Sequence, residues 1–232
     1  FVFIMLAVIT AIITAAVFFF LPQAHAGDKT ISLKPVPIIT GFKNVVTNPK
    51  FYVFALAGSF SFSGLFVYVA HSPAIFMNHF QLTEKLYGGL FALLSVGFIG
   101  GSQLNHILTK KFSNQTILKT VLLIQTITAV LFLIGALQQW YGLTAVIVLL
   151  FISLSCCGIT YPNAAALCMA PFAKNAGTAS SLLGFIQIGI GGLISGCVSM
   201  LPFDAVTAMA FIMAVTTVIA LAILLLGQKA KP

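Results

Sequence analysis

The stretch "YGGLFALLSVGFIGGSQLNHIL", residues 87–108, decides the fold class of this chain. It contains no Asp, Glu, Lys or Arg. At 1.5 Å per residue it is long enough to cross the roughly 30 Å hydrocarbon core of a bilayer as a helix. Lys110 and Lys111 follow shortly after it. Because a charged side chain is costly in lipid, this pattern predicts a helix that spans a membrane and ends at one of its surfaces.

Similar apolar runs lie on both sides of this stretch, and together they predict an all-α integral membrane protein. We predict seven spans: Phe1–Leu21, Phe51–Ala70, Tyr87–Leu108, Ile117–Ala136, Leu143–Leu167, Ala176–Leu201 and Ala205–Leu226. Only 6% of the residues are charged, whereas soluble domains have about 25%. A soluble globular fold is therefore excluded. The lack of arginine also argues against a nucleic-acid partner.

The eleven basic residues are all lysines, and their distribution predicts the topology. Lys85 falls in a loop on one side of the predicted spans. The others fall on the opposite side: Lys29, Lys34, Lys43, Lys50, Lys110, Lys111, Lys119, Lys174, Lys229 and Lys231. Positive residues in short loops stay in the cytoplasm, so we expect a cytoplasmic C-terminus and a first residue outside. Ile39, Phe42 and Val46 also predict a short amphipathic helix on the inner surface, ended by Pro49.

Polar residues within three spans recur at helical spacing and predict a shared cavity. Each would leave hydrogen-bonding groups in lipid unless it faced water or a partner. We expect five of them to contact substrate: Ser61, Tyr68, Thr160, Asn163 and Gln187. Pro162 is expected to break its helix and to free a backbone carbonyl. The alternative is that each polar side chain simply bonds a neighbouring helix.

Glycine pairs predict places where two helices approach closely. Gly97 and Gly101 have GxxxG spacing, and so do Gly192 and Gly196. Lipid provides no hydrophobic reason for helices to associate, so close packing must hold them together. Ordinary tight packing and helices that slide during gating are both compatible with these pairs.

Several other chemistries are not supported by the residues present. No Asp, Glu or Lys lies near the middle of any predicted span, which argues against an intramembrane protease or a voltage sensor. The four cysteines have no metal-ligand spacing, so no metal, cofactor or enzymatic activity is expected. We expect His71 and His79 to lie outside the spans and to be solvated.

Three segments resemble a known family. These are "NPKFYVFALAGSFSFSGLFVYVAHSPAIF" (48–76), "LYGGLFALLSVGFIGGSQLN" (86–105) and "GITYPNAAALCMAPFAKNAGTASSLLGFIQIGIGG" (158–192). They resemble the seventh, eighth and tenth-to-eleventh helix regions of the Bcr/CflA drug-resistance branch of the major facilitator superfamily. The resemblance implies twelve helices in two six-helix bundles. It also implies export of drugs such as bicyclomycin or chloramphenicol by proton antiport.

The resemblance also gives an interpretation of the polar stretch that ends the third span. It would be the inner loop between the eighth and ninth helices, where the superfamily carries a Gly-x-x-x-Asp-Arg motif. Asn105 and His106 stand where an acidic and a basic residue are expected, so the charge-relay form of the motif is lost. Together with Lys110 and Lys111, they would form a cytoplasmic helix exit with basic anchors.

The resemblance and the span pattern together predict the C-terminal half of a twelve-helix exporter in the inner membrane. Residues 1–21 would be the last helix of the N-terminal bundle, 22–50 the inter-bundle loop, 51–228 the C-terminal six-helix bundle and 229–232 a cytoplasmic tail. The expected partners are a drug-like substrate, protons, lipid and the missing N-terminal half, which would hold the proton carrier. The alternatives are a major facilitator protein for another solute, such as a metabolite or peptide, and a non-transporting membrane scaffold.

Overall fold

The computed structural model describes residues 2–20 and 35–229, and all of the regular structure in them is helical. Residues 21–34 and 230–232, which hold parts of the predicted loop and tail, lie outside the described residues. Seven of the described helices are long and apolar enough to cross a membrane, which confirms the predicted fold class. The elements are α1 (Val2–Phe20), α2 (Pro35–Val46), α3 (Pro49–Pro73), η1 (Ala74–His79), α4 (Glu84–Leu108), α5 (Asn114–Leu137), α6 (Leu143–Met169), η2 (Ala170–Asn175), α7 (Ala176–Val198) and α8 (Ala205–Lys229).

The chain divides into two compact units, residues 1–40 and 41–232, and the boundary falls inside α2. In the first unit, Thr10 and Thr14 of α1 bond backbone carbonyls one turn back, which satisfies their hydroxyls within the helix. In the second unit, the last turn of α2 buries Val45 in a cluster with Phe51 and Phe172. A helix is therefore present in the predicted segment, and its C-terminal end is part of the second unit, whereas its place on the inner membrane surface stays a prediction.

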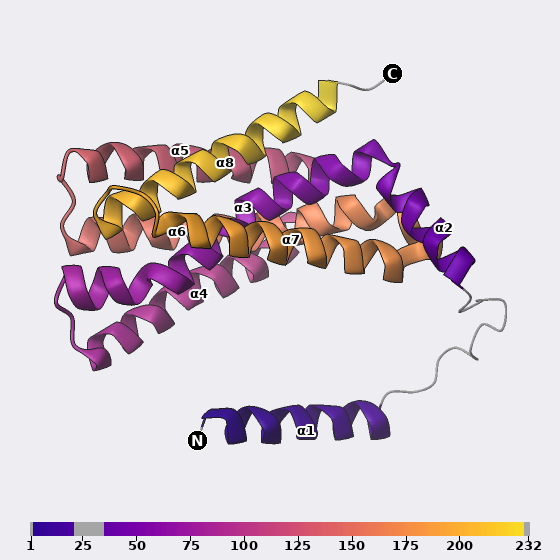
Figure 1. Ribbon diagram of the computed structural model, residues 1–232, viewed down its shortest axis with the longest axis horizontal. Coiled ribbons are helices and arrows are strands. Elements are labelled where there is room, and N and C mark those ends of the chain that lie inside the picture. The colour runs from indigo at the N-terminus through magenta and orange to yellow at the C-terminus, as the bar shows by residue number, and fades with distance from the viewer. Residues whose placement is uncertain (1, 21–34, 230–232) are drawn as a thin grey trace. The chain divides into compact units, whose positions relative to one another are not determined.

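Four of the six long helices of the second unit are central, namely α3, α5, α6 and α8. Each of α3 and α5 packs against both α6 and α8. The helix α4 packs on the outside of α6, and α7 packs on the outside of α3 (Figure 1). Residues of α4, α6 and α7 contact the neighbouring Phe62 or Phe66 of α3, so α4 and α7 border one face of the α3 and α6 pair. We call this the α3–α6 face, and α5 and α8 lie on the other side of that pair.

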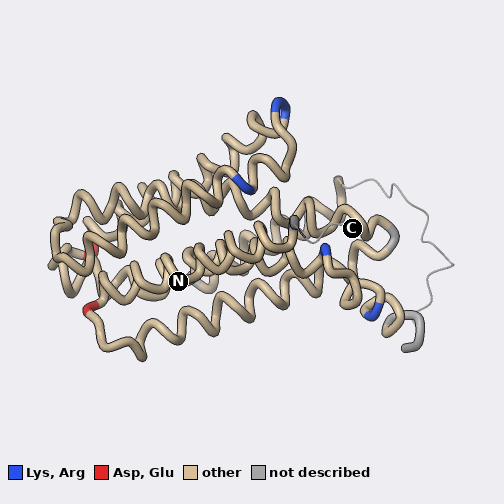
Figure 2. The backbone as a smooth tube through the Cα atoms, turned by 90° about the horizontal axis from the view of Figure 1, so that it is seen from above, with Lys and Arg blue, Asp and Glu red and all other residues tan. Residues whose placement is uncertain are grey.

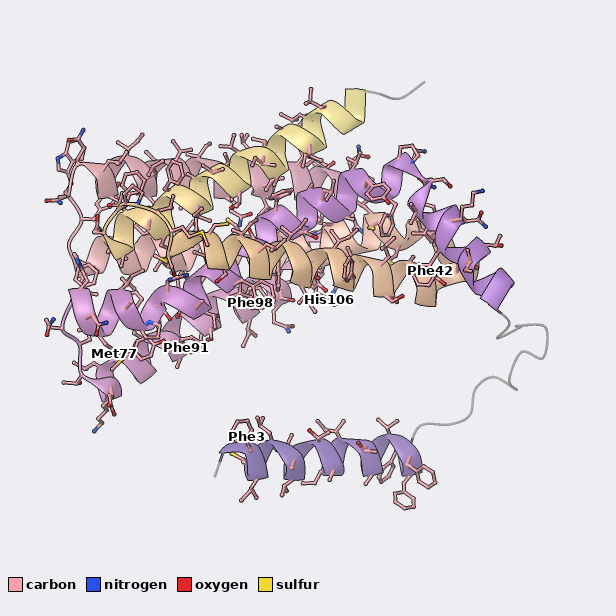
Figure 3. The ribbon with its side chains drawn as sticks, in the orientation of Figure 1. Phe3, Phe42, Met77, Phe91, Phe98 and His106 are labelled. Carbon is pink, nitrogen blue, oxygen red and sulfur yellow. The ribbon has the colours of Figure 1, made fainter. Side chains whose placement is uncertain are left out.

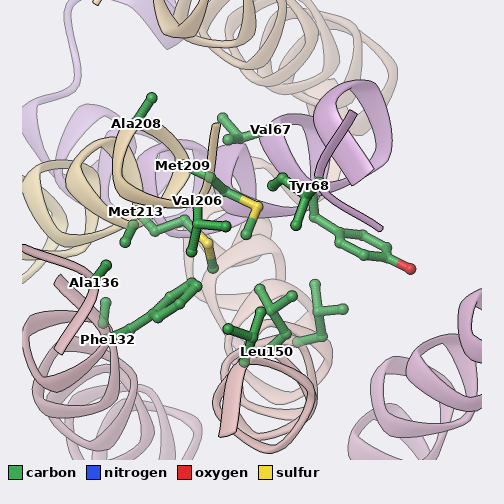
Figure 4. Packing of buried hydrophobic residues seen from close by; sticks show 14 of the residues in the cluster. Val67, Tyr68, Phe132, Ala136, Leu150, Val206, Ala208, Met209 and Met213 are labelled. Carbon is green, nitrogen blue, oxygen red and sulfur yellow. The ribbon is translucent and has the colours of Figure 1, made fainter. Parts of the chain in front are cut away.

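The largest apolar cluster fills the space between the central helices (Figure 4). Met209 and Met213 of α8 lie between Phe132 of α5, Leu150 of α6 and Val67 of α3. Unbranched methionine side chains suit the irregular gaps between helices. Since these helices are apolar on every side, hydrophobicity alone does not select the buried face, and shape and hydrogen bonding must do so.

The end of α3 differs from the sequence prediction. The span was expected to end at Ala70, but α3 continues to Pro73 and then as the π-helix η1 to His79. The amide N–H of Phe80 donates to the carbonyl of Ile75 over 3.0 Å, which is the wider spacing of a π-turn. The prediction that His71 and His79 lie outside the spans was therefore wrong. A membrane helix tolerates proline where local adjustments satisfy the freed backbone groups.

The expected break at Pro162 was also wrong, because α6 runs without interruption from Leu143 to Met169. The side-chain amide of Asn163 donates to the carbonyl of Ile159 over 2.7 Å. The carbonyl that Pro162 leaves without a helical N–H donor is that of Gly158, four residues back, so the Asn163 bond strengthens the same turn without replacing the missing one.

Candidate functional site

Four aromatic side chains form a continuous row on the α3–α6 face. Phe62 of α3 is central: its ring centroid lies 4.8 Å from Tyr161 of α6, 5.7 Å from Phe66 of α3 and 6.2 Å from Phe98 of α4. All four rings are half-buried, so each still presents part of its surface. Figure 3 shows Phe98 part-way along α4, between Phe91 and His106. We call these four residues the aromatic row.

The fourth helix of this face joins the row through a glycine. A Cβ atom at Gly191 of α7 would overlap the ring of Phe66, so only glycine allows α7 to lie this close. The row therefore crosses α4, α6 and α3 and reaches α7. The sequence analysis missed it because phenylalanine in an apolar span gives no periodic signal that separates a binding surface from lipid contact.

The surroundings of the aromatic row are uncharged. Away from their first and last turns, α3, α4, α6 and α7 carry no Asp, Glu, Lys or His. A half-buried apolar surface without charge can contact a neutral, ring-containing molecule by stacking and van der Waals packing.

Two of the expected substrate residues take part in a closed network inside the bundle. The hydroxyl of Ser61 donates to Oε1 of Gln125 over 2.7 Å and lies 2.9 Å from the hydroxyl of Thr160. Nε2 of Gln125 donates back to the carbonyl of Ser61 over 3.3 Å. Ser61 and Thr160 are 0% and 1% exposed, so here they join α3, α5 and α6, and substrate contact stays a prediction. Gln125 was missed, although a glutamine within an apolar span is itself a signal of such bonding.

Two other expected substrate residues are buried near the α3–α6 face. The ring of Tyr68 stacks on Phe91 of α4 at 5.6 Å, and its hydroxyl has no partner among the described residues. Gln187 is buried on the same side of α7 as Gly191, which faces α3. A buried polar group without a partner costs free energy, so the hydroxyl of Tyr68 remains a candidate for contact with a ligand. Substrate contact by Gln187 stays a prediction.

Asn163 of α6 pairs with Asn105 of α4. Nδ2 of Asn163 donates to Oδ1 of Asn105 over 2.6 Å, whereas Oδ1 of Asn163 has no partner in the described part of the chain. Asn105 lies buried in the last turn of α4, and His106 beside it is exposed. The two residues that the sequence analysis grouped in one loop motif therefore have different environments. Lys110 and Lys111 follow the end of α4 and are exposed.

The two glycine pairs also differ. A Cβ at Gly101 would overlap the backbone of Ser155 in α6, and one at Gly97 would lie 2.9 Å from the ring of Phe151. Gly158 of α6, which the sequence analysis did not single out, lies equally close to the backbone of Phe98. Gly192 and Gly196, in contrast, have open space around them among the described residues.

A sequence model described as Major Facilitator Superfamily matches residues 1–196. The chain belongs to the Major Facilitator Superfamily. The seven apolar helices of its described part are those of a multi-pass membrane protein of this superfamily.

Two curated relatives are similar along most of this chain. The chain is 26% identical over 219 residues to "Bicyclomycin resistance protein homolog" of Haemophilus influenzae. The matched region covers 94% of this chain and 54% of the relative. The chain is also 26% identical over 179 residues to "Uncharacterized MFS-type transporter YdgK" of Bacillus subtilis, covering 76% of this chain and 43% of the relative. The chain thus spans about half the length of these relatives. The first similarity fits the Bcr/CflA branch that the sequence motifs predicted.

The charged residues of this superfamily member separate toward the two ends of the bundle (Figure 2). Lys43, Lys50, Lys110, Lys111 and Lys119 adjoin the start of α3, the end of α4 and the start of α5, which lie at one end. Lys85, Glu84 and Asp204 lie at the other end.

Asp204 begins α8, and its carboxylate accepts the amide N–H groups of Val206 at 3.0 Å and Thr207 at 3.2 Å. Partial burial by itself would raise the pKa of Asp204. The hydrogen bonds from Thr207 and Val206 and the nearby His79 outweigh burial, so its pKa lies below the ordinary value. Asp204 is therefore an ionised helix cap at neutral pH.

Proposed function

We propose that this chain is the C-terminal half of a proton-coupled exporter of drug-like molecules, and that the aromatic row is its share of the substrate site. The observation that carries the proposal is the row itself, which presents four half-buried rings on a face bordered by α4 and α7. The similarity to the Haemophilus influenzae bicyclomycin resistance protein homologue supports drug export.

The uncharged surroundings of the row favour neutral or lipophilic molecules over charged metabolites and peptides. A carboxylate or ammonium group on a substrate needs an opposite charge or strong hydrogen bonds once it leaves water. The middle turns of α3, α4, α6 and α7 offer no charged side chain. Any charge selectivity would then come from a second bundle.

Proton coupling is proposed to reside in that second bundle. A proton carrier needs a group whose pKa crosses the working pH as access changes sides, and in lipid this is usually a carboxylate. The described acidic residues, Glu84 and Asp204, lie at helix ends, away from the aromatic row. Alternating access would then move two bundles against each other around a shared site.

The orientation follows from the lysine distribution. The end of the bundle that holds Lys110 and Lys111 would be cytoplasmic, and the end with Lys85 would face outward in the inner membrane. The C-terminus would then be cytoplasmic.

The proposal is tested by removing rings from the aromatic row in the whole transporter, expressed in a drug-sensitive bacterial strain. An aromatic contact contributes about 0.5–1.5 kcal/mol beyond area burial, which is about two- to twelvefold in affinity. We expect Phe62→Ala and Tyr161→Ala to change the KM for individual drugs by such factors, with different factors for different drugs. Tyr161→Phe, which keeps the ring, should have a much smaller effect.

Phe211→Ala is the matched control, because Phe211 is a half-buried phenylalanine on α8, outside the α3–α6 face. It should leave the drug profile unchanged. Wild-type export of every drug by both ring-removing variants, at wild-type protein level, would contradict the site. Transport of a charged metabolite but of no drug by the wild type would favour the other-solute alternative.

A further inference from the structure

A histidine at the Lys85 end of the bundle connects α3 to α7. Nε2 of His71, in the last turn of α3, lies 3.0 Å from the backbone carbonyl oxygen of Ser195 in α7. Within the described residues, this is the side-chain hydrogen bond that the structure shows between α3 and α7. His71 is half-buried between them.

The carbonyl of Ser195 needs this donor. Ser195 lies in the last turn of α7, and its regular helical donor is the amide of the capping residue Ser199, four residues on. That amide bonds the carbonyl of Cys197 instead. Buried or half-buried backbone carbonyls are usually paired, and the half-buried ring of His71 supplies a donor within 3.0 Å.

The bond matters because α7 has few other attachments. It packs extensively on α3, but only slightly on α6 and α8. Its N-terminal end is held by Ala179 and Leu183 in the apolar cluster around Phe51. Further along, Gly191 contacts Phe66. At the other end, the bond from His71 acts together with the burial of Val198. The exposed side of α7 carries Phe185, Ile188 and Leu193, which give no further hold within the described chain.

We propose that His71 is a positioning residue that fastens the end of α7 to α3, so that α7 moves with its bundle during transport. The fastening itself rests on the geometry above, and its role in transport rests on the proposed function. His71 lies five residues after Phe66, the last residue of the aromatic row on α3. It therefore acts through α7 and not by touching substrate. The bond requires a hydrogen on Nε2, which donates to the carbonyl.

The test compares three substitutions. His71→Phe keeps the ring volume but lacks a donor. His71→Gln keeps an N–H donor on a side chain of similar length, and His71→Asn has a donor on a shorter side chain. His106→Phe is the matched control, because His106 is an exposed histidine whose side chain makes no hydrogen bond in the described part of the chain. All are made in the whole transporter, purified and reconstituted in lipid.

The first measurement is the position of α7, by spin-label distances between cysteines placed at Met200 and Leu137 in a cysteine-free background. Both residues are exposed. Met200 follows the end of α7 and Leu137 is the last residue of α5, at the same end of the bundle. We expect His71→Phe and His71→Asn to shift or broaden the distance distribution, His71→Gln to restore it and His106→Phe to leave it unchanged.

The second measurement is export by the same proteins. Loss of one hydrogen bond should lower kcat roughly two- to tenfold with the KM for drug nearly unchanged, and His71→Gln should recover most of the rate. Wild-type distances in both His71→Phe and His71→Asn would overturn the fastening. Altered distances with wild-type kcat would overturn the role in transport. If the wild type exports no drug, the proposed function fails, while the distances still decide the fastening.

Discussion

At the scale of single residues, the described glycines bring one backbone closest to another where α4 crosses α6. Gly101 and Gly158 each let the backbone of the other helix come so close that a Cβ would overlap it. In lipid, where helices gain no hydrophobic free energy by associating, such backbone contact is a main source of stability. Gly100, which is next to Gly101, has open space around it among the described residues. The chain therefore contains its own matched comparison.

We expect Gly101→Ala to destabilise the protein by about 1–3 kcal/mol, because the added methyl group must push α4 away from α6. Gly100→Ala should be neutral or stabilising by up to about 1 kcal/mol, since alanine is the better helix former. Thermal unfolding of both variants in the same detergent measures the difference. Equal melting temperatures would show that the crossing is less tight than the structure indicates.

At the scale of elements, a few buried polar bonds determine how the helices pair. Ser61, Thr160 and Gln125 connect three central helices, and Asn105 with Asn163 connects α4 to α6. The apolar surfaces around them would also allow other rotations of each helix. A buried polar group that loses its partner in lipid has no water to replace it, so these bonds disfavour the alternatives.

Gln125→Met should destabilise the bundle by about 0.6–2 kcal/mol, in the range measured for hydrogen bonds between membrane helices. Methionine keeps the length and apolar stem of the side chain, so the loss reports the amide bonds. Combined with Ser61→Ala, the effect should be clearly less than additive, since both variants remove the same contact. Chemical unfolding in mixed micelles gives the values, and Gln138→Met at the exposed end of α5 is the control. Strict additivity would place Gln125 outside the network.

At the scale of the whole molecule, the lysines give the bundle two different ends. Apart from Lys85, the lysines with described side chains adjoin helix ends on one side, and they come from segments far apart in the sequence. Arrangement at one end requires the helices to alternate in direction, which the structure has. Positive-inside bias then relates the charge pattern to the orientation in the membrane.

The orientation predicts an accessibility pattern in intact cells. In a cysteine-free background, Lys85→Cys should react with a membrane-impermeant maleimide, because the proposed orientation puts the first turn of α4 outside. Lys111→Cys should react only after the cells are opened. Labelling is read on gels, and blocking with a permeant maleimide checks that both cysteines are reactive. Labelling of position 111 but not of 85 in intact cells would reverse the proposed topology.

The sequence by itself determined the helical class, the number of spans and the ends of the bundle to which the lysines belong, because length, hydropathy and charge act locally along each segment. It also located Gly97 and Gly101 at a close contact and Asn163 among the polar residues of α6. It did not reveal that Ser61 bonds Gln125 or that the rings of Phe62, Phe98 and Tyr161 meet.

Only the tertiary structure decided those pairings, as it decided the continuation of α3 past Ala70 and the bond from His71 to α7. The physical reason is that helices apolar on every side have no face that sequence periodicity can assign. Which side of each helix is buried depends on the shape and hydrogen-bonding groups of neighbours distant in the chain. Gly192 and Gly196 have the same spacing as Gly97 and Gly101. In the packed bundle, however, the described residues leave open space beside the α7 pair, whereas the α4 pair contacts α6.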